Sequence, residues 1–370
     1  MVVQYHRGKF PPDGLLDWSR LIPLLGPTAA AVARYDGMLA AIPNADVLLA
    51  PLTTQEAVLS SRIEGTQVAI GEILEFEAGR VPESRERRDD IHEVLNYRSA
   101  MRRARTSLET LPLSQRVIRD AHSVLLAGAR GEGYAPGEYR RVPNWIGPPG
   151  CSLEDARFVP IAADGLPDAM STWEGYIHEE VPDRLVQLAV LHAEFEALHP
   201  FLDGNGRLGR MLVPLFMWQH GLIRAPMFYI SAYFEARRDA YYDGLLAVSR
   251  DDDWTGWARF FLEALGEQAE DNLKKARGIL DLYGKMKNRV MEITRSQYAI
   301  LALDWIFERP IFSASHFRNR AGIPTSSVQR ILVALREGEI LRVLVPASGR
   351  QASVLVFPEL LNIAEGRDVF

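Results

Sequence analysis

The sequence predicts a mainly α-helical protein, and three observations support that prediction. Apolar residues recur at helical spacing along most of the chain, most clearly over 184–198, where Leu185, Leu188 and Phe195 share one face. Glycine and proline punctuate these stretches at intervals typical of helix ends. Strand-like patterns are confined to two regions, 139–160 and 341–357.

Bulk composition indicates a soluble globular protein. The 370 residues suggest two or three domains, and 47% of them are hydrophobic and 24% charged. A net charge of −6 gives the whole chain no basic signature for nucleic acid. The only cysteine, Cys151, excludes a disulfide within the chain and fits a reducing compartment, so we expect a cytoplasmic location. We expect no signal peptide and no membrane-spanning helix.

The N-terminal region is predicted to be a helical extension after an extended lead-in. Residues 1–30 are rich in proline and glycine, and a helical pattern begins near Thr28. A second helix is expected with Thr53 and Glu56 at the spacing of a capping box, and Gly65 ends it. Further helices are expected over 66–78, 83–104 and 114–127.

The middle of the chain is predicted to contain a small hairpin followed by long helices. Tyr139–Ile146 resembles a strand, and residues 157–160 supply its return strand. Helices are then expected over 166–180, 184–198, 206–219 and 231–285.

The C-terminal region has a different element order. A helix over 296–307, a short helix capped by Ser313, and a helix over 325–337 precede two strand-like runs, 341–345 and 353–357. This is the order of a winged helix. The predicted domains are therefore 1–105, 106–285 and 286–370.

The predicted winged helix differs in charge from the whole chain. Residues 290–357 hold eight arginines and five acidic residues, a local balance of +3. Its predicted recognition helix, over 325–337, offers Ser326, Ser327, Gln329 and Arg330, which suit contact with DNA. A surface for docking a protein or forming a homodimer fits this module equally well.

One segment, His199-Pro-Phe-Leu-Asp-Gly-Asn-Gly-Arg-Leu-Gly-Arg210, combines several parts of a nucleotide site. The turn Gly204-Asn205-Gly206 precedes a helix, whose free N–H groups and dipole attract anions. Arg207 and Arg210 share a helix face and can clamp phosphate oxygens.

Two further residues of the segment suit the chemistry of group transfer. Asp203 can hold a Mg²⁺ that bridges phosphates, and His199 can accept a hydroxyl proton near neutral pH. Each part alone is more often structural, since a histidine at a helix end or a single Gly-x-Gly is common. Their combination within twelve residues predicts phosphoryl or nucleotidyl transfer.

The segment resembles the signature of the Fic family, H-x-F-x-[D/E]-G-N-G-R-x-x-R, at every specified position. The resemblance implies a Fic-type helical core that transfers AMP from ATP to a Ser, Thr or Tyr hydroxyl and releases pyrophosphate. It also implies that His199 is the general base, that Asp203 ligates Mg²⁺ and that Phe201 anchors the loop. The residues it places at the ATP phosphates are Gly204, Asn205, Gly206, Arg207, Leu208, Gly209 and Arg210.

A second motif, Ser60-Ser-Arg-Ile-Glu64-Gly65, resembles the family's inhibitory helix, [S/T]-x-x-x-E-[G/N]. A glutamate before a glycine at a helix end is usually only solvated. Beside the Fic signature, the motif implies that Glu64 pairs with Arg210 and removes the arginine that should hold the γ-phosphate. The chain is therefore similar to the self-inhibited class with an N-terminal inhibitory helix.

Two further sets of residues occupy positions with a role in the family. Asn144, Trp145, Ile146 and Gly147 fall at the flap, where an extended target segment adds as a strand. An ordinary surface hairpin explains them equally well. Tyr241 and Tyr242 fall where relatives contact adenosine, although core aromatics at helical spacing would show the same pattern.

Three functions remain open from the sequence. The first is a protein adenylyltransferase acting on an unknown target protein or on itself. The second is a relative that transfers another phosphate-containing group or removes AMP. The third is a DNA-binding regulator with a vestigial site, which is disfavoured because no signature position is lost. The other helical histidines are interpreted as structural: His92, His122, His192 and His220.

Overall fold

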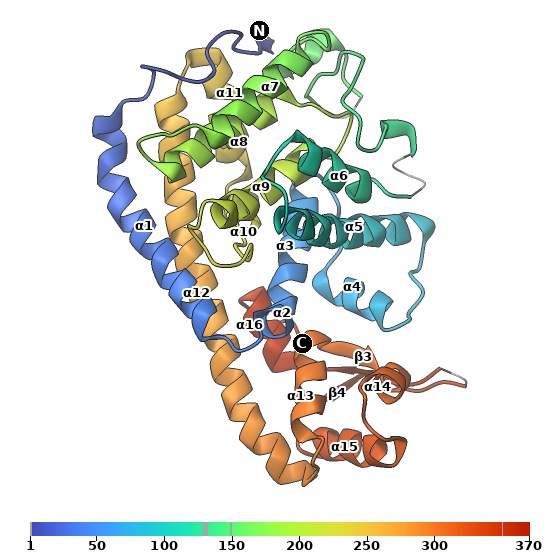
Figure 1. The fold of residues 1–370 in the computed structure, drawn as a ribbon. Coiled ribbons are helices and arrows are strands. Elements are labelled where there is room, and N and C mark those ends of the chain that lie inside the picture. The colour runs from blue at the N-terminus through green and yellow to red at the C-terminus, as the bar shows by residue number, and fades with distance from the viewer. Residues whose placement is uncertain (1, 129–131, 149, 350) are drawn as a thin grey trace. The chain divides into compact units, whose positions relative to one another are not determined.

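The computed structural model describes residues 2–128, 132–148, 150–349 and 351–370. The described chain is mainly helical, as predicted (Figure 1). It divides into two compact units, of which the first comprises residues 1–36, 59–65 and 96–270. The second comprises residues 37–58, 66–95 and 271–370. The predicted division into three domains stays a prediction.

The N-terminal helices are α1 (Trp18–Ala41), α2 (Ala45–Leu48), α3 (Ala50–Ile63), α4 (Ile70–Glu77) and α5 (Arg85–Leu108). The extended lead-in predicted up to residue 30 is wrong, because α1 already begins at Trp18 and contains Pro23 and Pro27. Leu21 and Val32 are among its buried residues. Their tertiary packing outweighs the cost of the helix hydrogen bonds that the two prolines cannot donate.

The capping box predicted at Thr53 is also wrong. Thr53 lies inside α3, and its hydroxyl donates to the Leu49 carbonyl at 3.4 Å. The helix starts earlier because Pro51 and Leu52 are already buried in its apolar face. The predicted end of this helix is confirmed, since Gly65 follows it with φ 109°.

The first unit is built around α8 (Arg184–Leu198), whose residues are almost all buried. It packs against α7 (Leu166–His178), α9 (Asn205–Gln219) and α11 (Arg238–Asp251) (Figure 1). The start of α12 (Trp254–Thr294) also lies against α8, since the Trp257 indole donates to the Ala189 carbonyl at 2.7 Å. The remaining helical elements here are α6 (Gln115–Leu125), η1 (Glu132–Tyr134), η2 (Leu153–Asp155) and α10 (Ser231–Ala236).

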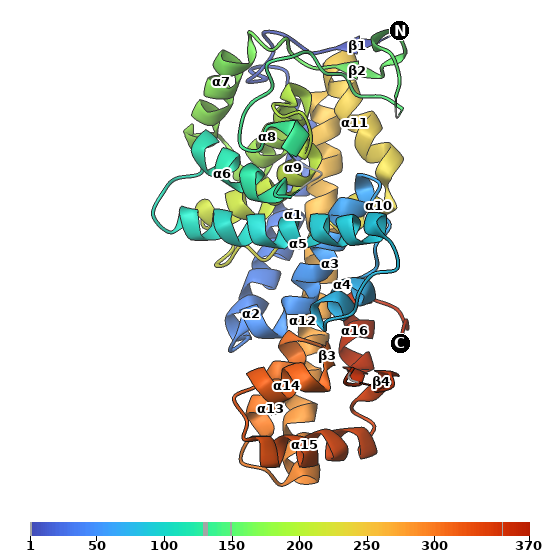
Figure 2. The same cartoon turned by 90° about the vertical axis from the view of Figure 1, so that its right-hand side faces the viewer.

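The strand predicted over 139–146 is wrong except at its end. Only Ile146 forms a bridge, antiparallel to Phe158, while β2 (Phe158–Val159) pairs in parallel with β1 (Val3–Gln4) (Figure 2). Arg140 explains the difference, because its backbone N–H donates to the Pro200 carbonyl and its buried side chain turns inward.

The C-terminal part of the second unit has the element order predicted for it, with two added elements. The order is α13 (Ala299–Glu308), β3 (Ile311–Ser313), α14 (Ala314–Arg320), α15 (Thr325–Glu337), β4 (Arg342–Val345), β5 (Val354–Val356) and α16 (Pro358–Glu365). The strands form an antiparallel sheet of order β3-β5-β4. Ser313 caps α14 as predicted, accepting from the His316 N–H at 3.2 Å. Arg350 lies outside the described residues.

None of the helices in the described ranges combines the length and the apolar character that crossing a membrane requires.

Candidate active site

The loop between α8 and α9 has a fixed backbone. His199 and Gly204 both adopt left-handed conformations, with φ of 46° and 81°. The Asn205 side chain bridges the loop, accepting from the Phe201 N–H at 2.9 Å and donating to the Phe201 carbonyl at 2.8 Å. Phe201 is fully buried and stacks on His122, with ring centroids 3.8 Å apart. Phe201 therefore anchors the loop in the core, as expected.

His122 supports this loop in a way that sequence reasoning missed. Its Nδ1 accepts a hydrogen bond from the Gly137 N–H at 2.8 Å, so Nε2 carries the proton and donates to the Asp203 carbonyl at 3.0 Å. Burial lowers the pKa of His122 to about 4, which keeps the ring neutral. His122 thus fixes the backbone at Asp203.

Arg140 is a second support that sequence reasoning missed. Its buried guanidinium donates to four backbone carbonyls, those of Leu198, His199, Ile161 and Val142. Three of these partners lie 21 to 59 positions away, so no local sequence pattern could have identified Arg140. Arg140 holds the end of α8, and with it the position of His199.

A cavity of about 410 Å³ lies beside the loop and brings together much of the predicted site. The predicted residues that line it are Glu64, Ile146, Gly147, His199, Gly206, Arg210, Tyr241 and Tyr242. The other predicted residues are not among those that line it: Ser60, Gly65, Asn144, Trp145, Asp203, Gly204, Asn205, Arg207, Leu208 and Gly209. His199 and Arg210 therefore face the same space.

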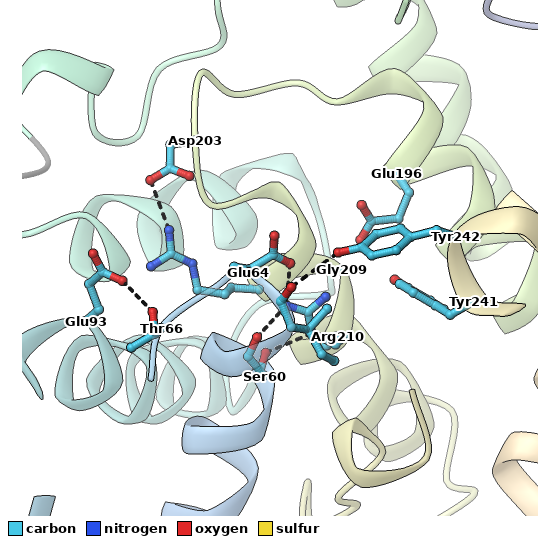
Figure 3. Close-up of polar contacts among 12 residues, drawn as sticks. Ser60, Glu64, Thr66, Glu93, Glu196, Asp203, Gly209, Arg210, Tyr241 and Tyr242 are labelled. Carbon is cyan, nitrogen blue, oxygen red and sulfur yellow. Dashed lines mark hydrogen bonds and ion pairs between the residues drawn. The ribbon is translucent and has the colours of Figure 1, made fainter. Parts of the chain in front are cut away.

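The contact predicted between Glu64 and Arg210 is present (Figure 3). Nη2 of Arg210 donates to Oε1 of Glu64 at 2.7 Å and to the Ser60 carbonyl at 2.8 Å, and Nε donates to Oγ of Ser60 at 2.9 Å. The Arg210 side chain is fully buried, while Glu64 is 35% exposed. Burial alone would lower the pKa of Arg210, but Glu64 holds it above its ordinary value.

The Glu64 carboxylate also occupies space over the first turn of α9. A Cβ atom at Gly206 would lie 2.2 Å from Oε1 of Glu64, so only glycine leaves room there. This turn presents the free N–H groups of a helix start, which favour an anion. In this structure, the anionic group beside it is the Glu64 carboxylate.

The His199 ring is in its neutral form, which can accept a proton. Burial lowers its pKa to about 4, against the opposing effect of the Glu64 carboxylate. The ring is therefore neutral near pH 7. Its Nδ1 is buried and has no hydrogen-bond partner among the described residues.

Asp203 and Arg207 form an ion pair outside the cavity lining. Oδ2 of Asp203 lies 3.0 Å from Nη2 of Arg207, with Asp203 45% exposed and Arg207 buried. Within the described ranges, no group of three or more His, Cys, Asp or Glu is placed to hold a metal ion. Asp203 by itself offers one half-exposed carboxylate, a ligand of the kind that Mg²⁺ takes.

The two tyrosines predicted at the adenosine differ in their surroundings. Tyr241 is buried, stacks on Phe234 with ring centroids 4.5 Å apart, and bonds His192 at 2.9 Å. Tyr242 is less buried, and its hydroxyl donates to the Ile63 carbonyl at 3.5 Å. Tyr241 thus meets the description of a core aromatic while also lining the cavity, and the adenosine role stays a prediction.

The predicted flap residues lie at one side of the cavity. Ile146 and Gly147 line it, and Asn144 donates to the Phe201 carbonyl at 3.4 Å. Trp145 is 42% exposed, and its indole donates to the Cys151 carbonyl at 2.9 Å. The segment is therefore hydrogen-bonded to the loop between α8 and α9 through Asn144 and is exposed to solvent at Trp145.

Comparison with known proteins identifies the family. The N-terminal domain of the Fic/DOC family matches residues 22–106, and the Fic/DOC family domain matches residues 112–217. The chain belongs to the Fic/DOC family. The first match contains Glu64, and the second contains the whole His199–Arg210 segment.

Curated relatives of this Fic/DOC chain are named as adenylyltransferases. A probable protein adenylyltransferase of Aquifex aeolicus (strain VF5) is 25% identical over 202 residues, which cover 54% of this chain and 58% of that protein. Protein adenylyltransferase fic-1 of Caenorhabditis briggsae is 26% identical over 166 residues, covering 43% of this chain and 30% of that protein. The chain thus spans little more than half of the first relative and less than a third of the second.

Solved structures show the same fold. A Fic family protein from Desulfovibrio desulfuricans G20 is similar at a TM-score of 0.57 and 21% identity, over 91% of this chain and 95% of that chain. Fic-1 from C. elegans is similar at a TM-score of 0.54 and 19% identity, over 71% of this chain and 74% of that chain. The predicted Fic-type helical core is confirmed.

Proposed function

We propose that this Fic/DOC protein is a protein adenylyltransferase that transfers AMP from ATP to a Ser, Thr or Tyr hydroxyl of a target protein or of itself. One observation carries the proposal: a neutral His199 and the buried Arg210 face the same cavity at the start of α9. The names of the curated relatives support ATP as the nucleotide.

In this reaction, His199 accepts the proton of the target hydroxyl. The hydroxyl oxygen attacks the α-phosphorus of ATP and forms a phosphodiester bond to AMP. The bond between the α-phosphorus and the oxygen bridging to the β-phosphate breaks, and pyrophosphate leaves. A neutral imidazole near pH 7 is the form that this step needs.

The loop and α9 hold the triphosphate. Backbone N–H groups around Gly204 and Gly206 meet the α- and β-phosphates at the helix start, while Arg207 and Arg210 balance the β- and γ-phosphate charge. The Asn205 amide holds the loop in shape, since both of its polar atoms bond Phe201. Asp203 would hold a Mg²⁺, which neutralises phosphate charge when bound.

Glu64 restrains this activity by competing for Arg210. With Arg210 bonded to Glu64 and Ser60, the γ-phosphate lacks its arginine, and ATP binds in a pose unsuited to in-line attack. The N-terminal motif therefore acts as an inhibitor within the same chain.

Intact-mass spectrometry of purified Glu64→Gly protein with ATP, GTP, CTP or UTP tests the proposal. We expect a gain of one or more adenylyl groups with ATP and little with the other nucleotides. Transfer of a different phosphate-containing group, or removal of AMP from a pre-modified protein without net transfer, would replace adenylyl transfer by the alternative activity of the same site.

The C-terminal module supports a second proposal, that it is a winged helix that binds DNA. Ser326, Gln329 and Arg330 are exposed on α15, and Arg318 and Arg320 are exposed on α14. A gel shift across a salt series tests this, because each lost phosphate contact lowers the salt slope by about one. We expect Arg330→Ala to weaken binding. No shift of the intact protein at low salt would favour a protein partner or a second copy of the chain.

We place this activity in the cytoplasm, because a chain with Cys151 as its only cysteine suits a reducing compartment.

A further inference from the structure

Glu196 is an acidic residue of the cavity that the proposed chemistry does not use. It lies on α8, three residues before His199, and lines the cavity together with Glu64 and Arg210. Its side chain is 10% exposed. Its Oε1 atom is buried and has no hydrogen-bond partner among the described residues. A buried carboxyl group in such a position requires a physical explanation.

The surroundings of Glu196 are crowded and mostly polar. A Cβ atom at Gly209 would lie 2.3 Å from its Oε1, so the carboxyl group packs directly on the backbone of α9 before Arg210. Figure 3 shows Glu196 beside Tyr242. The titratable groups that face it come from three helices and a turn: His192 on α8, Arg210 on α9, Tyr241 and Tyr242 on α11, and Glu64 in the turn after α3.

Charge balance distinguishes the two carboxyl groups around Arg210. One guanidinium cannot fully balance two carboxylates, so the more deeply buried of the two acids is favoured in its protonated form. Glu64 is 35% exposed and bonds Arg210 at 2.7 Å, whereas Glu196 is more deeply buried. Burial raises the pKa of Glu196 to about 8. The Glu64 charge adds to this shift, and the Arg210 charge opposes it. The proton therefore resides on Glu196.

The hydrogen-bond directions agree with a protonated Glu196. The Gly209 carbonyl can only accept, so Nδ1 of His192, 3.0 Å away, donates to it. Nε2 of this neutral ring then accepts from the Tyr241 hydroxyl at 2.9 Å. The Tyr241 hydroxyl proton is thus engaged with His192 and is not available to an ionised Glu196 carboxylate.

We propose that Glu196 is a positioning residue for Arg210, neutral while Glu64 is bound there, ionised when Glu64 is withdrawn, and neutral again when a nucleotide phosphate arrives. The proposal rests on the proposed function, since it assigns the phosphate to Arg210. In the open state, Glu196 becomes the only carboxylate among the described residues that acts on Arg210 in the cavity, and it keeps the guanidinium there. The proton that Glu196 releases or takes up is exchanged with solvent.

Isothermal titration of ATP into Glu64→Gly protein, in buffers of different ionisation enthalpy, tests this exchange. We expect proton uptake on ATP binding, at most about one per site, and an ATP affinity that falls with rising pH by at most about tenfold per unit. The added change Glu196→Gln removes this uptake, because glutamine cannot ionise. Protonation of ATP itself is common to both variants and cancels in the comparison.

Glu194→Gln in the same background is the matched control. Glu194 is a buried carboxyl group on the same helix, but it faces Tyr5 and His6, with which it forms hydrogen bonds of 2.6 and 2.7 Å. This control should keep the proton uptake. Equal uptake with and without Glu196 would overturn the proposal while leaving adenylyl transfer intact.

Unfolding experiments without nucleotide provide a second test. Because the pKa of Glu196 is raised in the folded protein, its contribution to stability is present at low pH and is lost as pH rises toward about 8. The melting temperature of Glu196→Gln, relative to that of the wild type, should therefore rise between pH 5 and about 8. In the Glu64→Gly background, this relative rise should end at a lower pH, because the Glu64 charge no longer raises the pKa of Glu196.

The two tests separate the two proposals. A constant melting-temperature difference across this pH range would contradict the raised pKa and overturn the role of Glu196, whatever the nucleotide result. The melting-temperature difference could instead depend on pH while Glu64→Gly fails to bind ATP at all. That result would contradict the proposed function and the return of Glu196 to its neutral form.

Discussion

Oε1 of Glu64 lies 2.7 Å from Nη2 of Arg210, although 146 positions separate the two residues in the chain. The contact joins the end of α3 to the first turns of α9. Arg210 is fully buried, so a partner for its charge is needed whether or not nucleotide is present. Under the proposed function, Glu64 and an ATP phosphate compete for this one guanidinium.

Ser60→Ala should weaken the inhibitory contact moderately. The Ser60 hydroxyl accepts from Nε of Arg210 at 2.9 Å, and its loss should cost about 1 kcal/mol, raising transfer by roughly fivefold. The matched control is Ser61→Ala, because the neighbouring hydroxyl is buried and has no hydrogen-bond partner among the described residues. Initial rates of self-modification measure both. Equal rates for the two variants would show that the Ser60 bond does not restrain Arg210.

His199→Ala should remove transfer from the Glu64→Gly protein without removing ATP binding. Loss of a general base costs about 10²- to 10⁴-fold in rate, while the phosphate contacts of α9 stay in place. Single-turnover rates and ATP titration measure the two effects separately. His220→Ala, at the C-cap of α9 outside the cavity lining, is the control and should transfer at the parent rate. A similar loss in both variants would point to a general structural defect.

The pH profile of transfer should lack an acid limb near the ordinary histidine pKa. Burial lowers the pKa of His199 to about 4, so the ring is neutral throughout the range from pH 6 to 8 and becomes protonated only as pH falls through about 4. The Glu64 charge raises the pKa of His199, so removing Glu64 should leave this pKa low. The measurement is kcat of Glu64→Gly at saturating ATP. A loss of rate centred near pH 6.5 would contradict a buried, neutral base.

Arg140→Lys should destabilise the protein and slow transfer together. A lysine keeps the charge but cannot reproduce the bonds to the carbonyls of Leu198, His199 and Ile161. Leaving buried carbonyls unsatisfied should lower the free energy of unfolding by about 1 to 3 kcal/mol. Arg141→Lys is the control, since Arg141 is exposed and forms a surface ion pair with Glu138. Denaturant unfolding of both variants checks the prediction, and equal midpoints would contradict it.

The sequence was informative wherever a feature is local. The bounds of α8 and α15 agree with the predicted helices, because their apolar residues repeat at helical spacing and turn residues flank them. The His199–Arg210 segment and the Glu64 motif were recognisable because each is a short continuous pattern. Their meeting in one place followed from the resemblance rather than from any pattern between them.

Features that depend on distant contacts were not predictable in this way. His122, Arg140 and Glu196 acquire their roles from partners on other elements, and nothing in their neighbouring residues indicates this. The same reason explains the pairing of Val3–Gln4 with Phe158–Val159, since two-residue strands leave no periodic pattern. It also explains the missing strand over 139–146, where a single inward-turned arginine redirects the backbone.

The central claim is that Glu64 restrains AMP transfer by holding Arg210. The most direct test compares wild-type protein, Glu64→Gly and Glu64→Gly/His199→Ala in a cell extract supplied with ATP labelled at either the α- or the γ-phosphate. A hydrogen bond to a charged group is worth about 1.5 to 3 kcal/mol, so Glu64→Gly should incorporate α-label about 10- to 100-fold faster than wild type. It should not raise γ-label above the level that the extract gives with wild type, and the double variant should lose the gain in α-label. Equal α-labelling by wild type and Glu64→Gly would contradict the claim.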